Sequence, residues 1–82
     1  MRVIYAYEAP RDETLEREIA SDLSARFGPA SQTDAVESAS GIISVTLDLD
    51  VADHPAAEGA AERIRVRGRV IDAAAESLGE GA

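Results

Sequence analysis

Residues 42–51 read Ile-Ile-Ser-Val-Thr-Leu-Asp-Leu-Asp-Val, and this stretch decides the fold. From position 43 onward, apolar side chains alternate with serine, threonine and aspartate. Successive side chains of an extended chain point to opposite faces, so this pattern is typical of a strand with one buried face. We therefore expect a strand over 42–51 at the centre of a sheet.

Two further strands are expected before this one. Residues 2–8 combine β-branched and aromatic residues and stop before Pro10, which cannot continue a ladder of hydrogen bonds. Residues 31–37 are polar and contain one strong strand former, Val36, so the sequence leaves two alternatives. They form either a loop or an edge strand that pairs with 42–51 across a turn, and we adopt the edge strand because its polar, acidic pattern suits a sheet edge.

A helix is expected over residues 12–27. Asp12 is a suitable N-cap, and apolar side chains recur every four residues from Leu15 to Phe27, which gives one apolar stripe. Gly28 accepts a capping conformation that other residues disfavour, and the proline after it cannot continue the helix.

The segment after residue 51 fits two templates. As a helix over 55–78, it carries an apolar seam with heptad-like spacing; as a strand, four arginines alternate with apolar residues and glycine over 63–70. The longer pattern and the alanine-rich flanks favour the helix, although Gly68 weakens it. Such a helix would be about 36 Å long and would overhang a domain of this size. We therefore expect it to bend near Gly68 or to have its seam covered by a second protomer.

These elements predict a single α+β domain over residues 1–82 with the order β-α-β-β-α. A right-handed crossover leaves a gap between the first two strands that the third strand fills, so we expect an antiparallel sheet of order 2-3-1. Both helices then cover one face. The topology resembles a ferredoxin-like half-sandwich without its last strand, and the resemblance is one of topology and not of any sequence motif. The first strand is left as an open edge.

Composition and charge exclude several classes of function. The net charge of −8 repels phosphates, so we expect neither nucleic acid nor an anionic membrane as a partner. The chain has no cysteine, one histidine, no glycine-rich phosphate loop and no nucleophile elbow, so we expect no enzyme and no cofactor. No apolar run approaches the roughly 20 residues that cross a bilayer, and we expect a cytoplasmic protein. All basic residues are arginine and alanine is abundant, as a GC-rich bacterial source would produce.

Candidate contact residues fall into three groups. The possible interface residues, on the open edge or the helical seam, are Val3, Ile4, Tyr5, Tyr7, Ile64, Gly68, Ile71 and Leu78. Weaker candidates for contacting an anion or a partner are Arg63, Arg65, Arg67 and Arg69. The nearest approach to a set of metal ligands consists of Asp48, Asp50, Asp53 and His54. Solvation of a sheet face and helix capping explain this third group without a metal ion, so we predict no metal site.

The leading functional hypothesis is a noncatalytic protein–protein interaction or oligomerisation module. We expect a homodimer formed through the edge at 2–8 or the seam at 57–78, with another protein as the other possible partner. An acidic regulator that mimics nucleic-acid charge and binds a basic protein is the first alternative, because residues 1–53 carry most of the acid excess. The second alternative is a regulatory domain that binds a small ligand.

Overall fold

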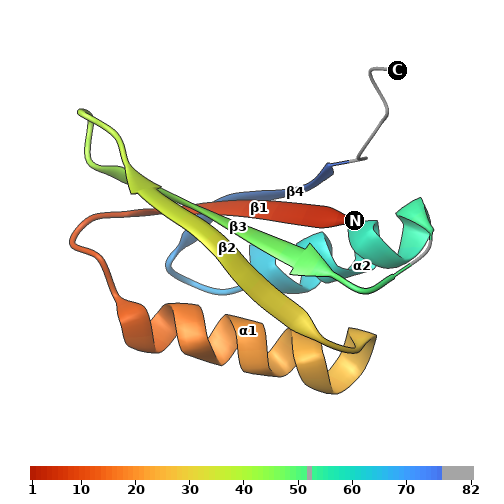
Figure 1. Ribbon diagram of the computed structural model, residues 1–82. Helices are drawn as coiled ribbons and strands as arrows, with labels where there is room; N and C mark the ends of the chain where they lie inside the picture. Colours follow the sequence, from red (N-terminus) through yellow and green to blue (C-terminus); the bar gives the residue numbers. More distant parts are fainter. Residues whose placement is uncertain (52, 77–82) are drawn as a thin grey trace.

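The computed structural model describes residues 1–51 and 53–76, which form a four-stranded antiparallel sheet and two helices. In chain order the elements are β1 (Arg2–Glu8), α1 (Glu13–Phe27), β2 (Ala30–Glu37), β3 (Ile42–Leu49), α2 (His54–Arg65) and β4 (Val70–Glu76). The strands lie in the order β2-β3-β1-β4. Figure 1 shows both helices on the same side of the sheet.

The predicted central strand is present as β3, which pairs with β2 on one side and with β1 on the other. Its alternate apolar side chains face the helices, and Leu47 is completely buried. The opposite side chains, including Ser44 and Asp48, are exposed. The alternation in the sequence therefore corresponds to a sheet with one covered face.

The predicted first helix is present as α1. The Asp12 carboxylate accepts a hydrogen bond of 3.0 Å from the Leu15 N–H, which satisfies one of the free donors at the helix start. Leu15, Ile19 and Leu23 are buried against the sheet, so the stripe with a four-residue spacing is the core face. The helix ends at Gly28, whose φ of +87° is one that residues with a Cβ rarely adopt.

Of the two alternatives for residues 31–37, the strand is correct. β2 forms a hairpin with β3 around a turn in which the Ser38 N–H donates to the Ile42 carbonyl at 2.8 Å. Gly41 has a φ of +83° in this turn. The pairing of β2 with β3 shifts register between Gln32 and Asp34, so β2 contains a bulge.

The helix predicted over 55–78 is wrong for residues 66–76, and residues 77 and 78 lie outside the described part of the chain. Two successive turns follow α2: the Arg67 N–H donates to the Ile64 carbonyl at 3.0 Å, and the Val70 N–H donates to the Arg67 carbonyl at 3.1 Å. The chain then returns as β4, which pairs antiparallel with β1. The strand order is therefore 2-3-1-4 instead of 2-3-1, and β1 is not an edge. With α2 about 18 Å long, no helix overhangs the domain.

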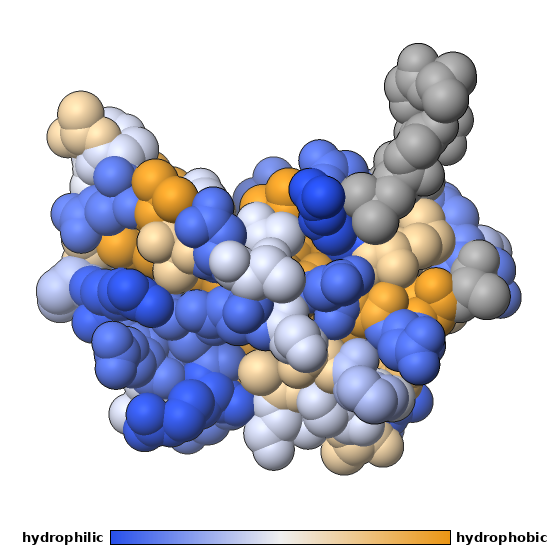
Figure 2. Space-filling model, viewed as in Figure 1, coloured by the Kyte–Doolittle hydropathy of each residue, from blue (hydrophilic) through white to orange (hydrophobic). Residues whose placement is uncertain are grey.

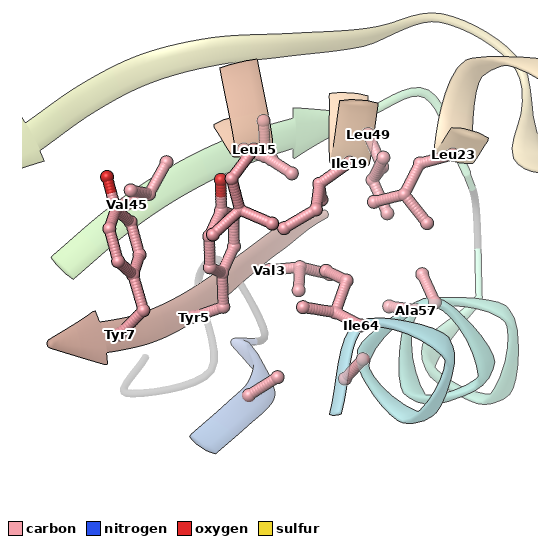
Figure 3. Close-up of a cluster of buried hydrophobic side chains, with 14 of the residues drawn as sticks. Val3, Tyr5, Tyr7, Leu15, Ile19, Leu23, Val45, Leu49, Ala57 and Ile64 are labelled. Carbon is pink, nitrogen blue, oxygen red and sulfur yellow. The ribbon is translucent and has the colours of Figure 1, made fainter. Parts of the chain in front are cut away.

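The core lies between the sheet and the two helices. In Figure 3, Tyr5 and Tyr7 project side by side from β1 toward the α1 residue Leu15, and Ile64 of α2 approaches Val3. The contact between α2 and the sheet is lined by fully or almost fully buried small residues, namely Ala57, Ala60, Ala61 and Ala73. Small side chains let the helix backbone approach the sheet closely, so a chain with few large apolar residues still fills its interior.

Candidate functional site

The sheet face opposite the helices is uncovered, and we call it the open face. Its side chains alternate with the core residues of each strand, as the strand register requires. At its centre lie the partly buried residues Ile4, Ala6, Ile42 and Thr46 together with exposed Ala74. Val36 of β2, 53% exposed, pairs with Ser44 on this face. The space-filling view in Figure 2 shows small hydrophobic patches separated by hydrophilic side chains over the strands.

The open face carries far more negative than positive charge. Its carboxylates, all on exposed residues, belong to Glu8, Asp34, Asp48, Asp72 and Glu76. Its one guanidinium is that of Arg2, which pairs with Glu76 at 3.4 Å. Four carboxylates on this face thus lack an ion-pair partner within the part of the chain that the structure describes.

A hollow of about 330 Å³ lies at one corner of the open face, where β2 begins and β3 ends. Its lining consists of Pro29, Ser31, Asp48, Leu49 and Asp50. Two carboxylates and a hydroxyl therefore surround it, and it is open to solvent. This composition suits a positively charged or hydrogen-bond-donating group.

A second polar cluster is buried between α1 and the sheet around Glu16, which is only 3% exposed. Its carboxylate accepts hydrogen bonds from the Tyr7 hydroxyl, from two nitrogens of Arg11 at 3.0 Å each and from the Gln32 amide at 3.2 Å. The Tyr7 hydroxyl in turn accepts from the Asp12 N–H at 2.8 Å. These hydrogen bonds engage the Glu16 carboxylate fully and join β1, α1 and β2, so the cluster holds the fold together instead of facing a substrate.

Electrostatics in this cluster follow from its burial and its donors. Burial alone would raise the pKa of Glu16, but the hydrogen bonds from Arg11, Tyr7 and Gln32 outweigh it and hold the pKa below its ordinary value. Burial, and then the nearby Glu16 charge, raise the pKa of Tyr5, whose hydroxyl has no hydrogen-bond partner among the residues described. Both tyrosines therefore remain neutral at physiological pH, as core residues do.

Half of the predicted interface residues lie in the core. Val3, Tyr5, Tyr7 and Ile64 are at most 1% exposed, because β4 covers the edge of β1 and α2 packs on the sheet. They cannot contact a partner in this fold. The remaining predicted residues are dispersed: Ile4 is on the open face, Gly68 is in the turn before β4, Ile71 is 52% exposed in β4, and Leu78 lies outside the described residues.

The four arginines of residues 63–69 are divided among internal contacts and do not form one cationic patch. Each guanidinium has a carboxylate partner: Asp22 for Arg63, Glu62 for Arg65, Glu18 for Arg67 and Asp12 for Arg69. The hydrogen bond from Arg63 lowers the pKa of Asp22. Arg69 also lies 5.4 Å from the centre of the Tyr7 ring. Three of these arginines thus tie the α2–β4 region to α1 and its N-cap.

The four residues considered as metal ligands do not come together. The Asp53 carboxylate caps α2 by accepting from the Ala56 N–H at 2.9 Å, and His54 lies 3.3 Å from Glu58 one turn along the helix. Asp48 and Asp50 line the hollow described above. Across residues 1–51 and 53–76, no cluster of three or more acidic, histidine or cysteine side chains could hold a metal ion. The helices described are also too short or too polar to cross a membrane.

Both edges of the sheet are protected against pairing with another strand. On β2, the bulge beside Thr33 interrupts the regular ladder. On β4, the Ala73 carbonyl accepts hydrogen bonds from the Arg65 guanidinium, and the Ala73 N–H donates to the Asp72 carboxylate at 2.9 Å. Side chains thus occupy the backbone groups of Ala73 at the β4 edge, and the bulge makes the β2 edge irregular. Both features disfavour an added strand and favour contacts on the open face.

Replacing Arg65 and Asp72 together by alanine is expected to expose the β4 edge. Freed backbone groups at Ala73 then become available to a second chain, so we expect concentration-dependent self-association in sedimentation velocity, with a loss of unfolding free energy of about 1 kcal/mol or less. Glu62→Ala is the matched control, because it removes the ion pair of Arg65 and leaves the Ala73 carbonyl bonded. A double variant that sediments like the parent protein at all concentrations contradicts this role.

The sequence predicts a sheet with both helices on one face, and therefore an uncovered face, but it does not predict the β4 residues on that face because residues 70–76 favour a helix. The burial of Glu16 is not predicted either. Glu16 does lie on the same side of α1 as Ile19 and Leu23, three and seven residues away, so its helical position was a usable signal. No protein-family model matches the chain, and no curated protein matches it either.

Proposed function

We propose that the chain is a noncatalytic protein–protein interaction module that binds its partner on the open face. The observation that carries the proposal is an uncovered sheet face with a partly apolar centre, on a sheet whose β4 edge is occupied at Ala73 and whose β2 edge carries a bulge. The other polar cluster is closed, with its carboxylate saturated by donors. We place the module in the cytoplasm, as expected from its composition.

The order β-α-β-β-α-β and the sheet order 2-3-1-4 support the ferredoxin-like arrangement expected from the sequence, now with the fourth strand. In such a half-sandwich the helices occupy one face of the sheet and leave the other free. We infer that this free face is where the module acts.

A second copy of the chain is a weaker candidate for the partner. The overlong helix that suggested a homodimer and the open β1 edge through which it could form are both absent from the fold. Stacking two open faces would bury Ile4 of each copy, a gain below the roughly 1.5–3 kcal/mol of a fully exposed side chain because Ile4 is already partly buried. It would also bring two groups of unpaired carboxylates together, and each pair of like charges about 10 Å apart costs about 0.4 kcal/mol even in water. With an association cost of at least 4 kcal/mol to overcome as well, self-pairing of this face is unfavourable.

Site-specific photocrosslinking tests the proposal. A photoreactive residue at Thr46 on the open face is expected to give a discrete crosslinked product in cells that produce the protein, whereas the same residue at Arg17 on the exposed side of α1 gives none. The product is identified by mass spectrometry, and the purified partner must rebind the parent protein. Equal labelling from both positions, or none from Thr46, would refute a binding role for the open face.

A further inference from the structure

We propose that the occupant of the open face is a basic protein segment, whose lysine and arginine side chains reach the carboxylates around the apolar centre. The inference rests on the proposed function and adds the chemistry of the partner. It concerns the same surface but makes a separate claim, because the open face could bind a protein that carries no excess of basic residues.

The distribution of arginine leaves the open face with an excess of negative charge. Six of the seven arginines outside this face already pair with a carboxylate of the chain itself. The remaining one, Arg17, donates to the Thr14 hydroxyl on α1. Arg2 is bound to Glu76. Arginine thus pairs with five carboxylates on the helix side, those of Asp12, Glu16, Glu18, Asp22 and Glu62. Among the described residues, the open-face carboxylates of Glu8, Asp34 and Asp48 have no ion pair, and that of Asp72 accepts only from the Ala73 N–H.

These carboxylates surround apolar side chains instead of forming an isolated acidic group. Asp34 pairs across the sheet with Thr46, and Asp72 pairs with Ala6, so each stands beside the partly buried centre. Asp48 lies at the other end, next to the hollow that it lines with Asp50. A segment with one apolar side chain over Ile4 and basic side chains on both sides matches this layout. Arginine fits the hollow well, because its planar guanidinium offers several donors to two carboxylates.

The same charges disfavour the other occupants. Nucleic acid would place phosphates against unpaired carboxylates, and a second copy would place carboxylates against carboxylates. Both partners repel the open face at long range, whereas a basic segment is attracted to it.

Titration of the isotope-labelled protein with synthetic peptides tests the inference. The probe is a peptide of about twelve residues that alternates arginine and valine, and its control replaces each arginine by glutamate. We expect the arginine peptide to shift the amide signals of Ile4, Thr46 and Asp48 and the glutamate peptide to shift none. The affinity should fall as sodium chloride is added, because exposed charge pairs are screened.

Two charge-matched variants then locate the contact. The double substitution Asp48→Asn and Asp50→Asn is expected to lower the affinity for the arginine peptide about fivefold, as expected for the loss of two partly exposed charge pairs. Glu13→Gln with Glu58→Gln removes the same charge from the helix side and should change the affinity less than twofold; circular dichroism checks that both remain folded.

Shifts confined to α1, equal losses in the two variants, or tighter binding of the glutamate peptide or of duplex DNA would overturn the inference. A photocrosslinked partner that is not basic, or that is a second copy, would overturn it while leaving the binding role of the open face intact.

Discussion

Replacing Ile64 by alanine is expected to lower the free energy of unfolding by about 3 kcal/mol, because the side chain is 1% exposed between α2 and β1. A single core in a domain of this size supplies only about 3–5 kcal/mol, so the alanine variant should be largely unfolded at 37 °C. Ile64→Val keeps most of the packing and should lose only about 1 kcal/mol, which stays measurable. Urea unfolding followed by circular dichroism gives both values.

The neighbouring Val66 provides the control. It lies two residues along the same segment and is 79% exposed, so Val66→Ala should change stability by less than about 0.5 kcal/mol. The sequence-based hypothesis placed Ile64 on a seam between protomers, and that hypothesis predicts an unfolding midpoint that depends on protein concentration. The present fold predicts the same midpoint at all concentrations. Similar losses for Ile64→Ala and Val66→Ala would contradict the position of α2.

Glu16→Gln is expected to lower the free energy of unfolding by about 2 kcal/mol. The substitution keeps the shape of the side chain but removes the charge that accepts hydrogen bonds from Arg11, Tyr7 and Gln32. Hydrogen bonds to a buried charged group each contribute about 1.5–3 kcal/mol, and Arg11 recovers part of the loss because it is 43% exposed and becomes solvated. Thermal and urea unfolding at pH 7 measure the change.

The pH dependence of stability gives an independent measure of the same carboxylate. The folded protein holds the pKa of Glu16 below its ordinary value of 4.5, so its stabilisation is complete above that pH and is lost as the pH falls through the folded pKa. The parent protein should therefore lose stability on acidification below about pH 4.5, and Glu16→Gln should lose less over the same interval. Arg63 also lowers the pKa of Asp22, so part of the acid-induced loss of stability remains in the Glu16→Gln protein.

Glu13→Gln, on the exposed side of the same helix turn, is the control for both measurements. It should change stability by less than about 1 kcal/mol and leave the acid-induced loss intact. A Glu16→Gln protein with the stability of the parent, or with an unchanged acid-induced loss, would show that the buried cluster does not stabilise the fold.

The first three quarters of the fold could be predicted because local patterns and tertiary packing agree there. The alternation in β3, the capping by Asp12 and the four-residue spacing in α1 each reflect one buried face of a regular element. Even β2, with few strand formers, was identified from the turn before β3. In these regions the residue types that favour each element are also the ones that its neighbours bury.

The last strand could not be predicted because its alanines favour a helix by local propensity. Ala73, Ala74 and Ala75 have no side-chain preference for a strand, yet they pair with β1, whose backbone donors and acceptors would otherwise remain unpaired. Ala73 is small because α2 packs directly over it. The free edge of β1 and this steric requirement therefore override propensity, and neither can be seen within residues 70–76 alone.

The candidate site was harder to predict than the fold. Aromatic and β-branched residues of β1 were interpreted as an exposed edge because the missing fourth strand left them uncovered. The Tyr5 and Tyr7 side chains instead point toward α1 and are buried, so the accessible surface is the opposite face with its acidic border. Because residues 70–76 were expected to be helical, buried residues of β1 were assigned to the accessible surface.

The pairing of Arg2 with Glu76 joins the two ends of the described chain across the sheet. During synthesis on a ribosome, β1 emerges first but cannot complete its second row of hydrogen bonds until residues 70–76 have left the exit tunnel. Contacts between such distant positions slow folding, because the entropy of closing a long loop is lost before they form. In a nascent chain stalled after α2, one edge of β1 should therefore have unpaired backbone groups. At this stage the protein is most exposed to non-native strand pairing.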